Sequence, residues 1–380
     1  MNDIFLINDS RKISCFSKNS FSKYKKSDII KLFEKNLILS KHYDASFIGI
    51  ELHISLYIND LFQNLFYISS LYTNIDYPNL PNLLNGYLLK YYNILGEIKK
   101  EKNILYKDHR NNQEIRNLIS KMICLVSLSP KNNNFQLGLL HKVDEIDYDI
   151  LMIKKKIKAD NLELTKNMFY DNELEELILV LNEIAYLLRF SNNDIKTIIY
   201  WISWIHELEN KSKNLNLNFR KIKDVNQKLT NLWEWILWNI ILNEVYYRNN
   251  DKLYLQIYGL YNFYKFNFKK SVRKKYLVYI FHAVYLLKNN IDFQKNPLKD
   301  KNHLIIETTL SNNIFYKTIF SKSEDKYFIE MKDDTVEKEN KILKGKNVKE
   351  KPPKEKKLSK KEEEIQKMNN RMNYLYNIVS

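Results

Sequence analysis

The residues best suited to chemistry lie in 258–281, a stretch in which lysine and arginine stand among tyrosine and phenylalanine. Lys269 and Arg273 are four residues apart, as are Lys270 and Lys274, so on a helix the two pairs form adjoining basic stripes. Such stripes can bind a phosphate backbone while aromatic rings stack on the bases. A solvated basic turn ahead of a buried helix is the alternative. The predicted nucleic-acid contacts here are Lys265, Lys269, Lys270, Arg273, Lys274 and Lys275, and the predicted stacking rings are Tyr261, Tyr264, Phe266 and Phe268.

A second basic segment, residues 341–361, holds ten lysines and two glutamates. Its net charge of +8 is half of the +16 carried by the whole chain of 380 residues. With Pro352 and Pro353, this composition predicts a disordered tether over 336–361. The predicted nucleic-acid contacts of the tether are Lys354, Lys356, Lys357, Lys360 and Lys361. Residues 362–380 regain helical spacing, and we expect this C-terminal helix to bind a protein partner.

The five tryptophans are confined to two segments. Trp201 and Trp204 share one predicted helix, and Trp233, Trp235 and Trp238 share the next. Because they are interleaved with isoleucine and leucine, the pattern favours a buried aromatic core. A platform on which bases stack is the alternative.

No catalytic, metal or cofactor site is predicted. The chain contains no GxxxxGK[ST], GxGxxG or GxSxG motif, which argues against a P-loop nucleotidase, a Rossmann enzyme and an α/β-hydrolase. His206 beside Glu207 is the nearest approach to a catalytic pair, but neighbours on a helix point about 100° apart, so a core or interface histidine is favoured. Two cysteines are too few for a disulfide framework and indicate a reducing, intracellular setting.

Glycine and proline are scarce, with six of each. Both have GC-rich codons, so part of this scarcity reflects an AT-rich gene, as does part of the lysine excess. The remaining glycines and prolines are expected largely at joints between helices. No secretory signal is recognised, and no apolar stretch reaches the roughly 20 residues that a bilayer helix needs.

Apolar residues recur at spacings of three and four, which predicts an all-α fold of two helical-hairpin units. The clearest hairpin joins helices at 174–188 and 195–209. Alternation in His303–Thr309 and Tyr327–Met331 also allows a short β-hairpin. The expected organisation is an N-terminal leader (1–28), helical unit 1 (29–150), a Trp- and Tyr-rich helical unit 2 (151–290), a small extension (291–335), the tether (336–361) and the C-terminal helix (362–380).

Three segments resemble a helical protein group of the large nucleocytoplasmic DNA viruses, the giant-virus lineage: IYWISWIHELE at Ile199–Glu209, LWEWILWNIILNE at Leu232–Glu244 and KKYLVYIFHAVYLL at Lys274–Leu287. Residues 45–128 are similar in outline to the helical collar of clamp-loader relatives, with Ala45, Glu51, Leu52 and Pro78 at matching positions. The AAA+ ATPase of those relatives is missing. The resemblance implies oligomerisation or scaffolding in a replication or transcription assembly, and no catalytic residue.

These observations together predict a non-enzymatic viral scaffold or adaptor that contacts nucleic acid, DNA or RNA, and viral protein partners. The predicted location is the viral factory of the host cytoplasm, or the virion. The alternative is a structural virion protein that lines the capsid or core. No membrane and no small-molecule substrate is expected.

Overall fold

The computed structural model describes residues 13–100, 106–132, 148–190, 194–212, 217–266, 268–310 and 312–324, with a few single positions outside these ranges. The described residues form fourteen α-helices and no β-strand, which confirms the predicted all-α fold. None of these helices combines the length and the apolar character needed to cross a bilayer.

The described chain divides into two compact units, and neither is continuous in sequence. Unit 1 contains the residues up to Leu61, Asn93–Leu128 and the described residues from Asp300 onward, whereas unit 2 contains Phe62–Tyr92 and Ser129–Lys299. The sequence predicted successive units at 29–150 and 151–290, so the observed division differs from the prediction. Local spacing locates a helix but does not say which distant helix covers it.

Six helices belong wholly to unit 1: α1 (Lys26–Ile38), α2 (His42–Ile54), α5 (Tyr106–Asn111), α6 (Gln113–Leu128), α13 (Asn302–Leu310) and α14 (Asn312–Glu324). Six belong wholly to unit 2: α7 (Ile150–Lys156), α8 (Glu175–Phe190), α9 (Ile195–Ser212), α10 (Trp233–Tyr247), α11 (Asp251–Lys265) and α12 (Arg273–Lys288), with the 3-10 turn η6 (Lys270–Val272) between the last two. The division falls inside the remaining two, α3 (Ile58–Ile68) and α4 (Leu80–Lys100).

Helix α2 is the centre of unit 1. Every residue from Ala45 to Ile54 is buried, because α1, α6 and α14 pack around it. Gly49 permits the close approach to α6, since a Cβ at this position would overlap Ile123 Cδ1. The chain returns after unit 2 to complete unit 1: α13 packs on α6, and Tyr316 of α14 is hydrogen-bonded to His53 Nδ1 of α2.

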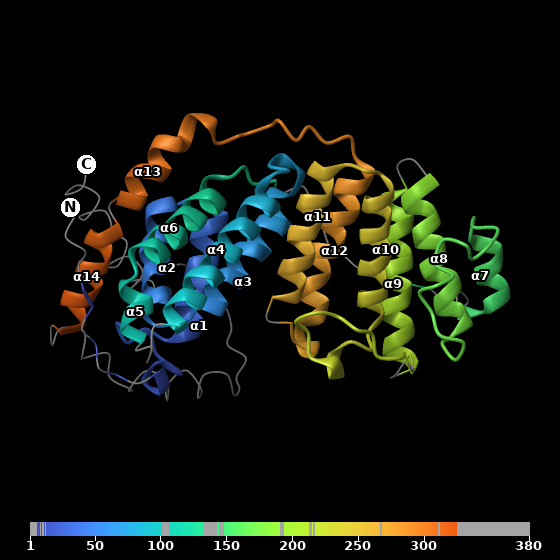
Figure 1. The fold of residues 1–380 in the computed structure, drawn as a ribbon, viewed down its shortest axis with the longest axis horizontal. Coiled ribbons are helices and arrows are strands. Elements are labelled where there is room, and N and C mark those ends of the chain that lie inside the picture. Colours follow the sequence, from blue (N-terminus) through green and yellow to red (C-terminus); the bar gives the residue numbers. More distant parts are fainter. Residues whose placement is uncertain are drawn as a thin grey trace, which may run out of the picture. The chain divides into compact units, whose positions relative to one another are not determined.

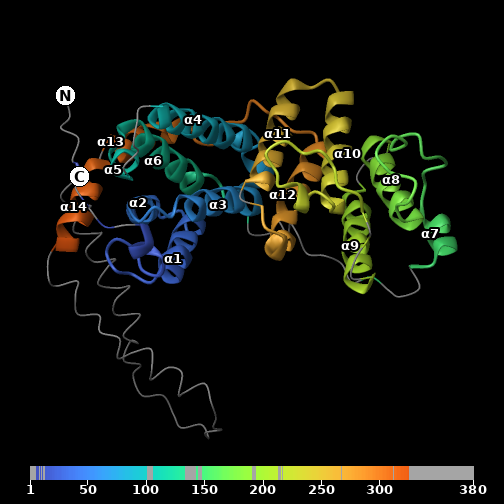
Figure 2. The ribbon, with the colours of Figure 1, turned by 60° about the horizontal axis from the view of Figure 1, so that its bottom comes forward.

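Helices α8 to α12 make the core of unit 2 (Figures 1 and 2). Helix α8 packs on α9 and α10, and α11 packs on α10 and α12. All five tryptophans are at most 2% exposed, which confirms their predicted place in a buried aromatic core. Trp235 and Trp238 of α10 meet Tyr264 of α11 at ring-centroid distances of 5.0 and 5.6 Å.

The predicted β-hairpin is wrong where the structure describes it. His303–Thr309 lies inside α13, whose residues Ile305 and Thr308 are buried three apart on one helix face. The hydroxyl groups of Thr308 and Thr309 donate to carbonyls four residues earlier, at 2.8 and 2.7 Å, so these β-branched residues are accommodated in a helix. Tyr327–Met331 lies outside the described residues.

The described glycines lie in helices rather than in turns, and two of them, Gly49 and Gly259, permit close packing. The four described glycines, at positions 49, 86, 96 and 259, all lie inside helices, so the expectation that glycines mark helix joints is wrong. The left-handed positions after helices are filled by other residues. Ser40 after α1 (φ 57°) and Leu56 after α2 (φ 61°) complete Schellman motifs, in which Lys41 N donates to Asn36 O and Tyr57 N donates to Leu52 O.

Candidate nucleic-acid interface

The connection between α11 and α12 positions the predicted lysines. Two phenylalanines in it turn inward: the ring of Phe266 lies 5.5 Å from that of Phe66, and the ring of Phe268 lies 5.1 Å from that of Trp235. Because these half-buried rings pack against core rings of unit 2, the lysines beside them face solvent. The exposed lysines are Lys269, Lys270, Lys274 and Lys275.

These four lysines differ in their contacts. The ammonium group of Lys275 lies 4.0 Å from the ring centroid of Tyr67, a cation–π contact. Lys269, Lys270 and Lys274 form no ion pair with any residue that the structure describes. Three positive charges are therefore presented to solvent within six residues of chain.

Arg273 points into the protein and is only 14% exposed. Its Nη2 forms an ion pair with Glu209, and its Nη1 donates to Glu234 Oε1 at 3.2 Å. Glu209 also accepts a hydrogen bond from Trp233 Nε1 at 3.0 Å. The guanidinium is thus held by two carboxylates from α9 and α10, and it is not available to a phosphate as the sequence predicted.

The cluster of Arg273, Glu209 and Glu234 carries little net charge near neutral pH. Burial raises the pKa of Glu234 to about 7, and the charge of Glu209 adds to this effect while Arg273 opposes it. Glu234 is therefore protonated for part of the time at pH 7. The two glutamates consequently do not cancel the charge of the lysines outside the cluster.

Lys265 ends α11 close to these lysines in the chain, and it is half-buried. Its ammonium group lies 4.9 Å from the ring centroid of Tyr261. Burial lowers the pKa of Lys265, nearby Asp224 raises it, and nearby Lys223 lowers it. Lys223 is exposed and comes from the loop between α9 and α10. Sequence reasoning missed this residue, because it lies 42 positions from Lys265 in the chain and nothing in the local pattern brings the two together.

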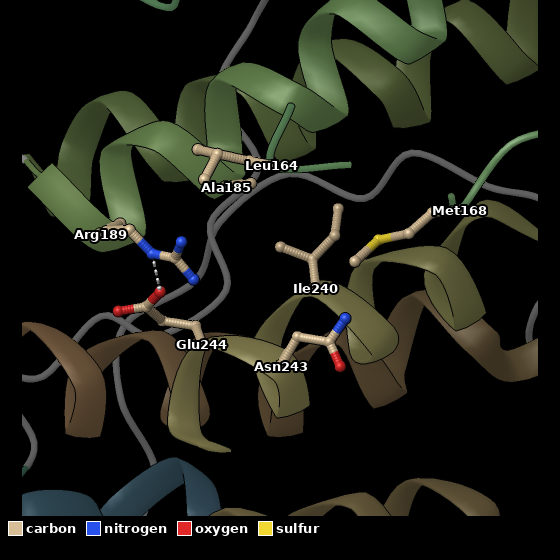
Figure 3. Close-up of a pocket in the computed structure, with 7 residues that line it drawn as sticks. All are labelled: Leu164, Met168, Ala185, Arg189, Ile240, Asn243 and Glu244. Carbon is tan, nitrogen blue, oxygen red and sulfur yellow. Dashed lines mark hydrogen bonds and ion pairs between the residues drawn. The ribbon is translucent and has the colours of Figure 1, made fainter. Parts of the chain in front are cut away.

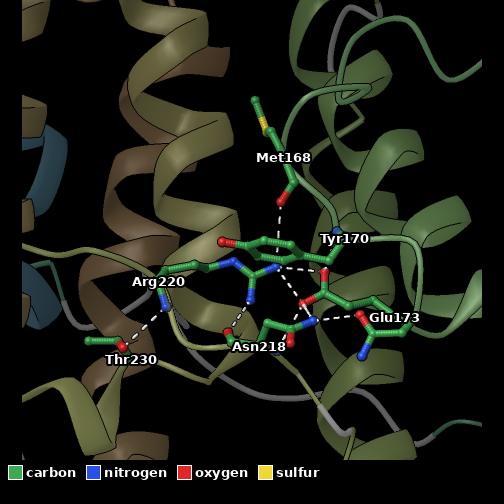
Figure 4. A network of polar contacts seen from close by, with 7 residues as sticks. Met168, Tyr170, Glu173, Asn218, Arg220 and Thr230 are labelled. Atoms are coloured by element: carbon green, nitrogen blue, oxygen red, sulfur yellow. Dashed lines mark hydrogen bonds and ion pairs between the residues drawn. The ribbon is translucent and has the colours of Figure 1, made fainter.

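A polar network fixes the loop that carries Lys223 (Figure 4). Arg220 Nη2 donates to both carboxylate oxygens of Glu173, at 2.7 and 2.9 Å, and its backbone N donates to Thr230 Oγ1 at 3.2 Å. Asn218 N donates to the same carboxylate at 3.0 Å. One buried glutamate therefore binds two points of the loop and limits the positions that Lys223 can take.

One of the four predicted stacking rings is a core residue. Tyr264 is fully buried, whereas Phe266 and Phe268 are half-buried and pack against core rings of unit 2. Of the four predicted rings, Tyr261 alone belongs to a row of rings that reaches the surface: its centroid is 6.2 Å from that of the exposed Tyr258. The spacing that predicted a basic helix end was informative, whereas it did not show which rings face outward.

His206 lies beside this region and is buried. Burial lowers its pKa, as do Lys274 and Arg273, while Glu207 and Glu209 act in the opposite direction. The imidazole of His206 is therefore close enough to Lys274 and Arg273 to interact with their charges. No three histidine, cysteine or carboxylate side chains are grouped for metal binding in the part of the chain that the structure describes.

A small pocket of about 230 Å³, counting open solvent, lies between α8 and α10 of unit 2 (Figure 3). Its lining residues are Leu164, Met168, Ala185, Arg189, Ile240, Asn243 and Glu244. The charged groups at its edge are already paired, since Arg189 Nε lies 3.0 Å from Glu244 Oε2. The pocket therefore supplies no unpaired charge with which to hold a charged ligand.

The predicted contacts Lys354, Lys356, Lys357, Lys360 and Lys361, and the predicted C-terminal helix 362–380, lie outside the described residues. Comparison of the chain with protein-family models, with curated proteins and with solved structures finds no match in any of the three.

Proposed function

We propose that this chain is a non-enzymatic helical adaptor that binds nucleic acid at the basic end of unit 2. The basic end is formed by Lys223, Lys265, Lys269, Lys270 and Lys274. Its charges come from the α9–α10 loop, from the α11–α12 connection and from the ends of α11 and α12 that adjoin this connection.

The observation that carries the proposal is the separation of charge around Arg273. The arginine and the two nearest glutamates neutralise one another in the interior, and the lysines remain outside without an ion-pair partner among the described residues. An unpaired lysine costs little free energy in water. When it contacts a polyanion it displaces bound counterions, and their release favours binding strongly. This arrangement favours phosphate contact over mutual ion pairing within the protein.

The residue types also indicate which part of the nucleic acid is recognised. Lysine is a flexible point charge, whereas base recognition in a groove depends on the planar fork of arginine or on amide side chains. Because the arginine of this region is held inside, the basic end is suited to contact with the backbone. We therefore expect affinity that depends on salt and little on sequence.

The second half of the proposal, a protein partner held by the predicted C-terminal helix, remains a prediction from the sequence. So does the setting, a replication or transcription assembly of a large DNA virus or the virion itself. Abundant copies in purified particles would favour the virion, and copies confined to infected cells would favour the assembly.

The test measures affinity for a labelled oligonucleotide at several salt concentrations, with the full chain. We expect the logarithm of the affinity to fall linearly with the logarithm of the salt concentration. The triple variant Lys269→Gln, Lys270→Gln, Lys274→Gln should reduce that slope by about 2 to 3, because each lost phosphate contact removes about 0.7 to 0.9.

The matched control is Lys31→Gln, Lys35→Gln, Lys41→Gln, which removes three exposed charges from the α1 region of unit 1. Its net charge equals that of the first triple variant. Equal weakening by both triple variants would show that binding follows overall charge rather than the basic end. Absence of binding at low salt by the wild-type chain would also contradict the proposal.

A further inference from the structure

The solvent-facing side of α11 is unusual for a surface helix. Such a face normally carries charged side chains. Between Lys252 and Lys265, however, the exposed residues of α11 are Tyr254 (38%), Leu255 (46%) and Tyr258 (36%), followed by the partly exposed Tyr261 and Asn262. This stretch of the face contains no acidic residue.

The tyrosine rings form a continuous row. The ring centroids of Tyr254 and Tyr258 are 5.7 Å apart with planes inclined by only 14°, and those of Tyr258 and Tyr261 are 6.2 Å apart. Tyr261 then contacts the ammonium group of Lys265. The row of Tyr254, Tyr258 and Tyr261, called the tyrosine row below, therefore leads directly into the basic end.

The opposite side of α11 already holds the helix in place, so the exposed rings of Tyr254 and Tyr258 are not needed to anchor it. Gly259 brings the backbone of α11 against that of α4, where a Cβ would lie 2.8 Å from Pro81 O. Gln256 Oε1 accepts from Asn82 N at 2.9 Å, and Gln256 Nε2 donates to Asn79 Oδ1 at 3.1 Å. The rings are thus presented by a helix whose position is fixed.

We propose that the tyrosine row binds the bases of a single-stranded nucleic acid whose phosphates contact Lys265, Lys269 and Lys270. The inference rests on the proposed function and names its ligand class. Aromatic side chains stack on any base, but the base faces are accessible only when the strand is unpaired. Rings that lead into lysines, with no acidic residue between Lys252 and Lys265, match a polymer whose bases and phosphates alternate.

The experiment compares a single-stranded oligonucleotide with a duplex of the same sequence, by fluorescence anisotropy with the full chain. The variant Tyr254→Ala, Tyr258→Ala should bind the single strand at least about 30-fold more weakly, the lower end of what the loss of two stacked bases implies. Its affinity for the duplex should remain that of the wild type. The matched variant Tyr254→Phe, Tyr258→Phe keeps both rings and should bind the single strand as the wild type does.

The outcomes separate this inference from the proposed function. If the alanine variant is folded and binds the single strand like the wild type, the tyrosine row does not stack on bases, although the basic end still binds nucleic acid. If the alanine variant binds both ligands normally but loses a self-association or a protein complex seen with the wild type, the row is a protein interface and the inference is wrong. If the lysine triple variant also has no effect, the proposed function fails as well.

Discussion

The guanidinium of Arg273 lies 3.2 Å from the buried carboxylate of Glu234, across the interface of α12 and α10. Glu234 is only 1% exposed, so its charge is costly unless it is paired or protonated. Arginine suits this position because one planar fork serves two carboxylates, Glu234 and Glu209, at once. A lysine, which is the residue type at the neighbouring basic positions, would pair less well with two carboxylates. This difference explains why the basic residue that points inward is an arginine.

The first prediction concerns the pH dependence of stability at Glu234. Burial raises its pKa from 4.5 to about 7, so the folded state binds a proton that the unfolded state has released. The stabilisation that comes from this bound proton is fully present below the pKa of Glu234 in the unfolded state, and it is lost as the pH rises through about 7. We expect the free energy of unfolding of the wild type to fall between pH 5 and pH 8 relative to that of Glu234→Gln, measured by urea unfolding. Parallel pH profiles of the two proteins would contradict the assignment.

The second prediction concerns His282, which is 1% exposed in α12. Neither ring nitrogen has a hydrogen-bond partner among the described residues, and burial lowers its pKa to about 3. Because the pKa of His282 is depressed in the folded state, the stabilisation that its neutral form contributes is present above pH 6.5 and is lost as the pH falls toward 3. We expect His282→Leu to raise the free energy of unfolding by about 1 to 3 kcal/mol at pH 7, by removing two unsatisfied polar atoms.

The same variant also tests the sign of the pH effect. Between pH 7 and pH 4.5, the wild type should lose more stability than His282→Leu, since only the wild type gains a proton at this site on unfolding. Chemical unfolding at the two pH values measures the difference. A leucine variant less stable than the wild type at pH 7 would show that the imidazole has a partner.

The third prediction concerns the approach of α11 to α4. In Gly259→Ala, the new methyl group would lie 2.8 Å from Pro81 O, a backbone atom that cannot move aside alone. We expect a loss of about 1 to 3 kcal/mol in the free energy of unfolding, because overpacking outweighs the better helix propensity of alanine. Thermal and urea unfolding measure it.

Gly86→Ala is the matched control for Gly259. Gly86 is an exposed residue in the interior of α4, and a Cβ there meets no atom within 4 Å. This substitution should stabilise the protein by about 0.5 to 1 kcal/mol, the ordinary gain from glycine to alanine inside a helix. Equal effects at the two positions would refute the close contact at Gly259.

The fourth prediction concerns the turn after α1. Ser40 is exposed and has a φ of 57°, a conformation that costs an L-residue about 1 to 2 kcal/mol and glycine very little. Ser40→Gly relieves this strain, but it also increases the entropy of the unfolded chain at a cost of about 0.4 to 1 kcal/mol. We expect a net gain of up to about 1.5 kcal/mol by urea unfolding. Ser40→Ala keeps the Cβ and should give no gain.

Helix positions were the most predictable part of the fold. The hairpin of α8 and α9 and the burial of all five tryptophans follow from apolar spacing, which acts within a few turns of one helix. The assignment of helices to units could not be predicted, because it depends on packing between segments far apart in the chain. The β-hairpin was wrong for a local reason: two threonines that favour a strand bond to helix carbonyls instead.

The candidate interface was predictable only in outline. A run of lysines around the α11–α12 connection was predicted from the sequence, and Lys269, Lys270 and Lys274 do face solvent. The inward orientation of Arg273 could not be predicted, because its partner Glu234 lies 39 positions away in the chain. The exposed ring of Tyr254 was not predicted, because it lies at the opposite end of α11 from these lysines.

The hydrogen bond between His53 and Tyr316 joins helices that are separated by the whole of Ser129–Lys299 in the chain. During synthesis at about 5 to 20 residues per second, those residues take roughly 10 to 30 s to appear. For that time, the faces of α2 and α6 that α13 and α14 later cover are open to water. Much of unit 1 is made before most of unit 2, yet unit 1 closes only after every residue of unit 2 has been made.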